Sequence, residues 1–185
     1  MTKLDDDRVT ELALRAGAGD ADAIARFVEA TYRDVWRFCC HLQDPSRADD
    51  LTQETFIRAL GAIGRFGGRS TARTWLLSIA RRVVVDHVRY ETSRPPSAYR
   101  DQDDTQIPLA RQQHGRHEEQ VEWSMLIDAL DADRREAFLL TQLLGLSYVD
   151  AAAVCGCPVG TIRSRVARAR EDLLAAHAAD AREFG

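Results

Sequence analysis

The sequence contains no apolar run of the roughly 18 residues that a membrane-spanning helix needs, and its polar, acidic N-terminus lacks the apolar core of a signal peptide. Neither of the glycine-rich fingerprints that cradle nucleotide phosphates, GxGxxG and GxxxxGK(S/T), is present. Cysteines are few, four in 185 residues, and their spacing matches no standard zinc module. We therefore expect a cytoplasmic protein that uses no membrane, metal, cofactor or small-molecule substrate.

The four cysteines fall in two pairs, Cys39-Cys40 and Cys155-x-Cys157. In a reducing compartment a buried cysteine behaves as a small hydrophobic residue, which is the interpretation we favour. The alternative is an enzyme with a thiolate nucleophile at Cys39 or Cys157 beside His41. No helix start or loop is arranged in an obvious way to activate either thiol, so the sequence predicts no catalytic residue.

Charge is distributed unevenly along the chain. The length of 185 residues, with 45% hydrophobic and 29% charged residues, suits one or two globular domains. The formal net charge is -4, yet arginines cluster at 69–89 and 163–170, while acidic residues gather at 5–7, 49–54 and 101–104. This separation predicts nucleic acid as the partner of the basic clusters and a protein as the partner of the acidic ones.

Residues 147–170 have the pattern of a helix-turn-helix. Ser147 can cap a short helix over 147–154, in which three successive alanines allow close helix packing. Gly156 supplies a turn conformation that a β-carbon would strain, and Pro158 suits the start of the next helix. In such a motif the second helix is the one that enters the major groove of DNA.

The second helix of this motif has two faces. Its apolar stripe consists of Ile162, Val166, Ala169 and Leu173. The other side carries arginines, which can read guanine through two hydrogen bonds or hold phosphates. A solvated arginine face is the alternative for an isolated Arg-rich helix. Four arginines in eight positions, behind a proper turn and opposite an intact stripe, favour DNA binding.

Two helices are expected before residue 40. The first covers about 8–18, and the second is capped by Asp20, with an apolar stripe that continues, after a short interruption, to Cys39. Aromatic side chains recur in the second helix at spacings of three and four: Phe27, Tyr32 and Trp36. This spacing favours a packed core over a stacking platform for bases.

A third helix follows Pro45, with Ser46 as its predicted cap. Its buried edge consists of Phe56, Leu60 and Ile63. Its other face presents four polar side chains: Asp49, Asp50, Gln53 and Glu54. These four residues are either ordinary solvated surface or a docking surface for a basic helical partner, and the residue pattern leaves both interpretations open.

A glycine-rich segment over 64–71 precedes a helix over 72–89. The apolar residues expected to pack inward are Leu76, Ile79, Ala80 and Val83. The arginines expected on the outside are Arg69, Arg73, Arg81, Arg82 and Arg89. A glycine-rich loop flanked by arginines and an aromatic residue is suited to gripping an unpaired base and its phosphates.

The chain changes character from Thr92 to about Gly115, where apolar residues are few, so we expect a linker. Helices resume near Glu118, with a stripe of Val121, Met125, Ile127 and Leu130. A helix over 134–144, capped by Asp131 or Asp133, supplies the floor of the helix-turn-helix with Phe138, Leu139, Leu140 and Leu143. The predicted fold is all-α, with two small helical domains joined by a flexible tether.

Three segments carry a resemblance to a known family: 49–56 (DDLTQETF), 74–81 (TWLLSIAR) and 156–165 (GCPVGTIRSR). Each segment is moderately specific alone, and the three in this order are highly specific. The chain resembles bacterial extracytoplasmic-function sigma factors, group IV of the sigma-70 family, over nearly its whole length. The resemblance implies a sigma-2 domain over 1–91, a flexible linker over 92–117 and a sigma-4 domain over 118–185.

The resemblance also implies promoter-specific transcription initiation together with core RNA polymerase. The residues at positions that meet the β′ clamp helices are Asp49, Asp50, Gln53 and Glu54. The residues at positions that capture a flipped minus-10 base and open the duplex are Phe66, Arg69, Ser70, Thr71, Arg73, Trp75, Arg81 and Arg82. The residues at minus-35 positions are Thr161, Arg163, Ser164, Arg165, Ala167 and Arg168. Residues 139–146 would lie near the surface that meets the β flap, and an anti-sigma protein is a further implied partner.

Two positions depart from the family pattern. Arg82 replaces the usual asparagine, and a guanidinium cannot accept a hydrogen bond from a base. Ala167 replaces the bulky aromatic of some relatives.

A second function also remains open: a helix-turn-helix regulator that binds duplex DNA as a dimer without polymerase. That alternative leaves the pattern of residues 49–82 unexplained.

Overall fold

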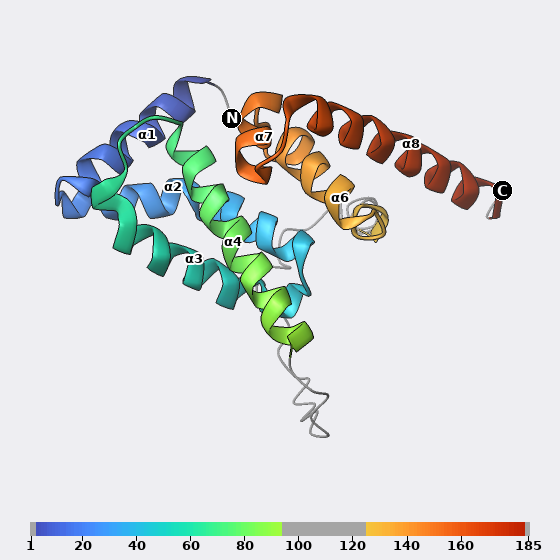
Figure 1. Ribbon diagram of the computed structural model, residues 1–185, viewed down its shortest axis with the longest axis horizontal. Helices are drawn as coiled ribbons and strands as arrows, with labels where there is room; N and C mark the ends of the chain where they lie inside the picture. The colour runs from blue at the N-terminus through green and yellow to red at the C-terminus, as the bar shows by residue number, and fades with distance from the viewer. Residues whose placement is uncertain (1–2, 94–124, 184–185) are drawn as a thin grey trace.

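The structure of the chain, a computed structural model, describes residues 3–93 and 125–183, and the regular elements in these ranges are all helical (Figure 1). Within them no helix has both the length and the apolar character that crossing a membrane requires. The elements in chain order are α1 (Lys3–Gly17), α2 (Ala21–Leu42), η1 (Pro45–Arg47), α3 (Ala48–Ala62), η2 (Ile63–Arg65), α4 (Ala72–Ser93), α6 (Ala132–Phe138), η4 (Leu139–Leu143), α7 (Tyr148–Cys155) and α8 (Val159–Glu183). The all-α prediction is confirmed, while the predicted linker lies outside the described residues except at 92–93, which complete α4.

Local sequence signals account for the start of α2. The Asp20 carboxylate caps this helix by accepting a hydrogen bond from the Ala23 N–H at 3.0 Å. The helix runs unbroken and buries Phe27, Val35 and Phe38 along one face, whereas Tyr32 is 45% exposed, so its predicted place in the core is wrong. The first helix also begins earlier than residue 8, at the acidic N-terminal turn.

The cap predicted at Ser46 is wrong. Asp44 takes this part, since its carboxylate accepts a hydrogen bond from the Ser46 N–H at 2.9 Å and starts the 3-10 turn η1. The helix α3 then begins at Ala48 without a side-chain cap. Two aspartates in its first turn, Asp49 and Asp50, lie near the positive end of the helix dipole, which favours the helix start.

The helix predicted over 134–144 is divided. The Asp131 carboxylate caps α6 by accepting a hydrogen bond from the Asp133 N–H at 3.1 Å, as predicted. After Phe138 the chain continues as a single π-helical segment, η4, in which the Leu144 N–H reaches back to the carbonyl of Leu139 at 2.9 Å. The wider turn changes which leucines face inward, so Leu143 is 38% exposed rather than part of the floor.

Residues 125–128 are helical and begin the second half of the described chain. Ile127 and Leu130 are buried as predicted, where they pack with Leu139, Ala169 and Leu173. Met125 is 68% exposed, so its predicted place in the buried stripe is wrong. Val121 and the start near Glu118 lie outside the described residues.

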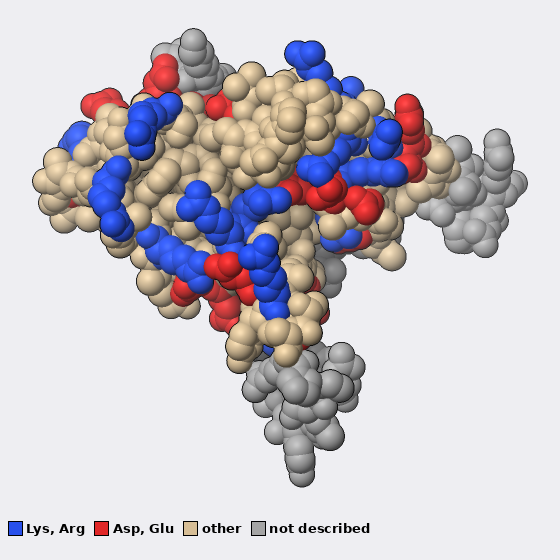
Figure 2. All heavy atoms as spheres, in the orientation of Figure 1, with Lys and Arg blue, Asp and Glu red and all other residues tan. Residues whose placement is uncertain are grey.

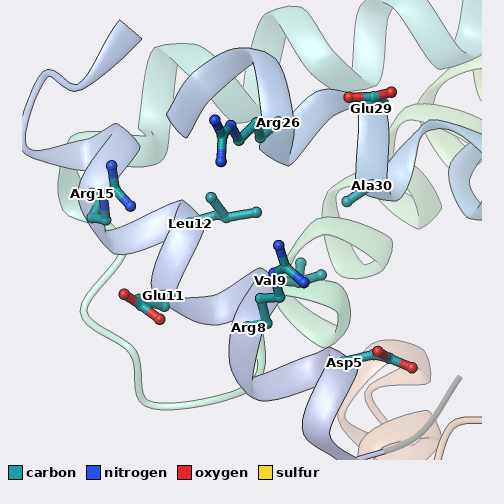
Figure 3. Close-up of a pocket in the computed structure, with 9 residues that line it drawn as sticks. All are labelled: Asp5, Arg8, Val9, Glu11, Leu12, Arg15, Arg26, Glu29 and Ala30. Carbon is teal, nitrogen blue, oxygen red and sulfur yellow. The ribbon is translucent and has the colours of Figure 1, made fainter. Parts of the chain in front are cut away.

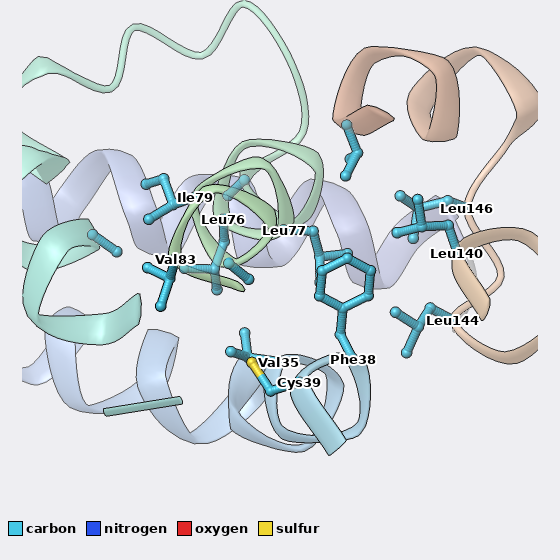
Figure 4. Close-up of a cluster of buried hydrophobic side chains, with 14 of the residues drawn as sticks. Val35, Phe38, Cys39, Leu76, Leu77, Ile79, Val83, Leu140, Leu144 and Leu146 are labelled. Carbon is cyan, nitrogen blue, oxygen red and sulfur yellow. The ribbon is translucent and has the colours of Figure 1, made fainter. Parts of the chain in front are cut away.

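The main hydrophobic core joins the two halves of the chain (Figure 4). Phe38 from α2 and Leu77 from α4 lie opposite Leu140, Leu144 and Leu146 from the second half. All five are less than 9% exposed. The α6–α8 half therefore packs against α4 and the end of α2, a contact that the sequence pattern of two domains joined by a tether did not specify.

Replacing Leu76 by alanine is expected to lower the free energy of unfolding by about 2–5 kcal/mol, because a fully buried side chain is removed and a cavity is left. Leu174→Ala is the matched control, since that side chain is 68% exposed. Its effect should stay within about 0.5 kcal/mol. Urea denaturation followed by circular dichroism measures both variants, and equal midpoints would contradict the core position of Leu76.

Candidate nucleic-acid and protein interfaces

The helices α7 and α8 form the predicted helix-turn-helix. The Ser147 hydroxyl accepts a hydrogen bond from the Asp150 N–H at 3.1 Å and caps α7. Gly156 ends α7 with a φ of 66°, in the left-handed region that a β-carbon disfavours. The Cys157 N–H then donates to the Ala152 carbonyl at 3.1 Å and closes the turn. The change of direction between α7 and α8 is therefore determined by residues of the turn itself.

The two faces of α8 separate as the sequence predicts. Ile162, Val166, Ala169 and Leu173 are all buried. The predicted minus-35 residues on the opposite face are exposed: Arg163, Ser164, Ala167 and Arg168. No ion pair joins Arg163 or Arg168 to another described residue, so both guanidinium groups are available to an external ligand. Thr161 is half-buried, and its carbonyl accepts a hydrogen bond from the Ser164 hydroxyl at 2.9 Å.

Arg165 differs from the other predicted minus-35 residues because it is already engaged within the fold. Its guanidinium forms an ion pair with Asp133 at the start of α6 and lies 3.9 Å from the Cys157 sulfur. The side chain is only 23% exposed. Arg165 therefore connects the turn of the helix-turn-helix, at Cys157, to the start of α6, at Asp133.

Loop 66–71, the segment predicted to grip an unpaired base, is anchored at both ends. Phe66 is 9% exposed and packs on Trp75 with ring centroids 5.0 Å apart. At the other end the Thr71 hydroxyl accepts a hydrogen bond from the Thr74 N–H at 3.2 Å and caps α4. Between the anchors Arg69 is exposed and Ser70 is half-buried, so these residues form the accessible part of the loop.

The expectation that Arg73 lies on the outside of α4 is wrong. Its side chain is 3% exposed and donates to Asp34 at 2.6 and 2.9 Å and to Asp6 at 3.2 Å. A further hydrogen bond of 2.7 Å reaches the carbonyl of Leu144 in the second half of the chain. The position follows from helix geometry, because Arg73 lies one turn before Leu77 and shares its inward direction.

Other predicted minus-10 residues on α4 are also near the second half. Arg81 donates to Glu136 at 2.6 Å, and that carboxylate is 7% exposed. The neighbouring Thr74 hydroxyl donates to Asp150 at 3.2 Å. Arg82 points to solvent, since it is exposed and has no ion pair with another described residue. The helix α4 thus carries both covered and accessible arginines.

Sequence reasoning missed the residues of the second half that make these contacts. Glu136, Asp150 and the Leu144 carbonyl receive donors from α4, and Asp128 lies 3.1 Å from His41 on α2. No local signal identifies them, because each partner lies more than fifty residues away in the chain. Figure 2 shows the resulting surface, with arginine side chains over α4 and over the α6–α8 half on one face.

The carboxylate face predicted on α3 is accessible. Asp49, Asp50 and Gln53 are exposed, and Glu54 is half-buried. The Trp36 indole N–H donates to Asp49 at 2.9 Å, and Arg58 bridges Glu54 and Asp86 with bonds of 2.7 Å. One apolar residue on this face was missed: Ile57, one turn beyond Gln53, is 60% exposed. An exposed apolar residue beside carboxylates is suited to a protein partner.

Two open grooves lie in the first half of the chain. One, of about 500 Å³, runs between α3 and α4 and includes Asp50 and Glu54 in its lining. The other, of about 540 Å³, lies between α1 and α2 and contains none of the predicted site residues (Figure 3). Both are lined by charged groups of both signs, which is typical of solvated surface.

The two buried cysteines, Cys39 and Cys155, lack the environment of a nucleophile. Burial raises the pKa of the Cys39 thiol to about 11, and burial together with Glu136 raises the pKa of the Cys155 thiol. All four cysteines are free thiols. Within residues 3–93 and 125–183 no three His, Cys, Asp or Glu side chains come together in a way that could hold a metal ion.

Comparisons with known proteins also divide the chain into two halves. Residues 27–94 match the sigma-70 region 2 family, and residues 120–173 match sigma-70 region 4. A solved structure of CnrH with the cytosolic domain of CnrY shares the fold with a TM-score of 0.70, at 26% identity over 92% of this chain and 97% of the other. The sigma factor RpoE of Bartonella quintana, in complex with the anti-sigma factor NepR, gives a TM-score of 0.62 at 28% identity, over 80% of this chain and 92% of the other.

A helix-turn-helix half matching region 4, preceded by a half matching region 2, defines an RNA polymerase sigma factor of the sigma-70 class. Similarity to curated proteins narrows the class. The chain is 59% identical to the extracytoplasmic-function (ECF) sigma factor SigC of Mycobacterium tuberculosis and to the probable sigma-C factor of Mycobacterium bovis, over 94% of this chain and 94% of each relative. It is 35% identical to the sigma-E factor of Escherichia coli over 86% of its length. The chain belongs to the ECF RNA polymerase sigma factors.

Alkylation tests the state of the buried thiols. At pH 8 Cys39 should react with iodoacetamide about a hundredfold more slowly than an ordinary cysteine, because its raised pKa keeps it protonated and its burial blocks access. Mass spectrometry of labelled peptides over time provides the rate of alkylation. The same chain unfolded in about 8 M urea is the unhindered reference. Native labelling as fast as labelling in urea would contradict the buried position.

Proposed function

We propose that this sigma factor divides its work among three surfaces: the carboxylate face of α3 binds core polymerase, loop 66–71 with α4 engages the minus-10 element, and α8 reads the minus-35 element. One observation carries the proposal. Arg163 and Arg168 stand exposed on the second helix of a helix-turn-helix, without an ion pair to another described residue, in a chain with both sigma-70 segments. Exposed arginines in this position suit major-groove contacts.

On the minus-35 side the exposed residues divide by chemistry. Arg163 and Arg168 have free guanidinium forks, which can each make a bidentate contact with guanine or hold a phosphate. Ala167 lies between them and offers a methyl group to thymine, while Ser164 tolerates several bases. Thr161 lies in the first turn of α8, where its hydroxyl suits a phosphate oxygen, while its own N–H donates to the Pro158 carbonyl at 2.9 Å. Arg165 acts indirectly, by holding the motif to α6.

On the minus-10 side access depends on how the two halves are arranged. Arg69 and Arg82 are exposed, whereas Arg73, Thr74 and Arg81 make bonds to the second half. These three side chains bond to residues of the second half, so they are covered and cannot contact DNA while the halves remain packed. We infer that the second half moves away from α4 when the factor joins polymerase and promoter, and that Arg73 stays within the first half through Asp6 and Asp34.

On the polymerase side the acidic face of α3 favours a basic, helical partner, and we assign this face to the β′ clamp helices. Ile57 adds an apolar contact at the centre of that face, beside Asp50, Gln53 and Glu54. Among the leucines of segment 139–146, Leu143 is exposed while Leu139, Leu140, Leu144 and Leu146 are buried, so Leu143 is the leucine that we assign to direct contact with the β flap.

Control by an anti-sigma protein is part of the proposal. The CnrH and RpoE structures that share this fold were both solved as complexes, and RpoE is bound to the anti-sigma factor NepR. Such a partner would cover the exposed faces of α3 or α8. We further propose that this factor has no catalytic activity, cofactor or small-molecule substrate of its own, since its buried thiols are poor nucleophiles and polymerase supplies the chemistry.

Run-off transcription with purified core polymerase on a promoter library tests this function. The factor should add transcripts from promoters that share a minus-35 and a minus-10 element, and core alone should yield none of them. A dimeric helix-turn-helix regulator would instead bind duplex DNA tightly without core in a gel-shift assay. Tight, sequence-specific binding of the isolated chain combined with no effect on initiation would overturn the sigma assignment.

Arg168→Ala and Arg163→Ala should each cost about 1–3 kcal/mol of discrimination at particular minus-35 base pairs if the contact is bidentate to guanine. The assay is competition among minus-35 variants for the holoenzyme. Arg33→Ala is the control, because Arg33 is exposed on α2, outside the helix-turn-helix. An equal loss on every variant would instead identify the two residues as phosphate contacts, with a weaker salt dependence of binding.

Asp50→Lys should weaken binding to core polymerase by about tenfold or more, because the exposed carboxylate becomes a charge that repels a basic partner. Glu29→Lys is matched in charge and exposure on α2 and should leave core affinity unchanged. Fluorescence anisotropy of labelled factor with core measures both affinities at fixed salt. Equal affinities of the two variants would reject the α3 surface as the polymerase contact.

A further inference from the structure

One face of α1 lies along the connection between α3 and α4, from η2 through loop 66–71 to the start of α4. The three residues on this face are Thr10, Leu14 and Gly17, which recur at spacings of four and three and therefore lie in one row. The helix α1 precedes the sigma-70 region 2 match, which begins at residue 27. Figure 3 shows the connection between α3 and α4 running beside α1.

The first contact is at the start of the connection. A β-carbon on Gly17 would lie 2.7 Å from the carbonyl oxygen of Ile63 and 3.5 Å from the α-carbon of Gly64. Because both partners are backbone atoms, they cannot yield as a flexible side chain would. The absence of a side chain at Gly17 therefore sets how closely η2 approaches α1.

The second contact is at the middle of the loop. Gly68 has a φ of 65°, and a β-carbon there would lie 3.7 Å from one methyl group of Leu14 and 3.8 Å from the other. Leu14 is 46% exposed, so it is an apolar support under the loop rather than a core residue. The loop beside Arg69 thus rests on a surface that α1 provides.

The third contact is at the end of the loop. The Thr10 hydroxyl accepts a hydrogen bond from the Ala72 N–H at 3.0 Å and donates to the Asp6 carbonyl at 2.8 Å. Ala72 is the first residue of α4 and is fully buried, so its N–H needs a partner that its own helix cannot supply. The two residues are 62 positions apart in the chain, and a single hydroxyl satisfies both backbone groups.

We propose that α1 is a positioning element for base capture: Thr10, Leu14 and Gly17 hold loop 66–71 in the shape that receives an unpaired minus-10 base. The proposal rests on the proposed function of the loop and deepens it. A preorganised loop loses less conformational freedom when the base enters, so the brace increases the contribution of that base to binding. Leu14 lies against the loop itself, whereas Gly17 and Thr10 fix the backbone on either side of it.

The test compares how strongly the captured base contributes to binding. The probe is a promoter recovered from the transcription library, with its minus-10 non-template strand single-stranded and each base replaced in turn by an abasic site. With wild-type holoenzyme one position should lose about tenfold in affinity, as expected for a stacked base. With the Thr10→Val holoenzyme the loss at that position should fall to about threefold or less, since the Ala72 N–H is unpaired and the loop is no longer held.

Matched variants separate positioning from general stability. Thr10→Ser keeps the hydroxyl and should restore the wild-type base dependence. Gly17→Ala tests the brace independently of Thr10 and should reduce the base dependence in the same direction. Thr92→Val, whose hydroxyl bonds only within α4, and Gly61→Ala, whose β-carbon would meet open space, should behave as the wild type.

The possible results are distinct. Base dependence that survives unchanged in both Thr10→Val and Gly17→Ala would overturn the brace while leaving the function of the loop intact. A wild-type holoenzyme that is indifferent to every abasic position would overturn the assignment of loop 66–71 to base capture, and the brace with it. Minus-35 discrimination is measured in parallel and should not change, because a general loss of folding would reduce it as well.

Discussion

The guanidinium of Arg73, on α4, is buried where this helix meets α1, α2 and the residue that follows η4. Removing a charged group from water is costly unless each of its donors finds a partner, and here two carboxylates and one carbonyl supply them. Asp34 and Asp6 bind it from α2 and α1, which orders the first half around α4. The bond to Leu144 extends the same network to the second half. A single buried charge thus couples the shape of the first half to the position of the second.

The contacts between the halves are of two kinds, and the difference matters for how they separate. Apolar side chains such as Phe38 and Leu140 exclude water without specifying direction. The polar bonds of Arg81 to Glu136 and of Thr74 to Asp150 determine the orientation. Both carboxylates and both donors can be hydrated once the halves part, so a large competing surface, such as that of polymerase, can replace these contacts.

Exposure in this structure follows function. The carboxylate face of α3 and the arginine face of α8 remain open to partners, while the side of α4 that we propose for the minus-10 element is largely engaged. Loop 66–71 lies at the boundary between these states. Its ends are tied by Phe66 on one side and Thr71 on the other, and α1 lies behind it, so only the short segment around Arg69 stays accessible. Rigid support behind a small accessible tip is an arrangement suited to selecting one base.

Periodicity and capping chemistry in the amino-acid chain were enough to predict the all-α class, the cap at Ser147, the turn at Gly156 and the two faces of α8, because these features depend on neighbours within one or two helical turns. The burial of Arg73 could not be predicted, because an arginine is buried only where carboxylates pair with it, and one of its partners, Asp6, is 67 positions away in the chain. The packing of α7 on α4, and the row of α1 residues beneath the loop, were likewise decided by three-dimensional proximity. Local patterns specify which face of a helix is apolar, but only the assembled fold specifies what that face meets.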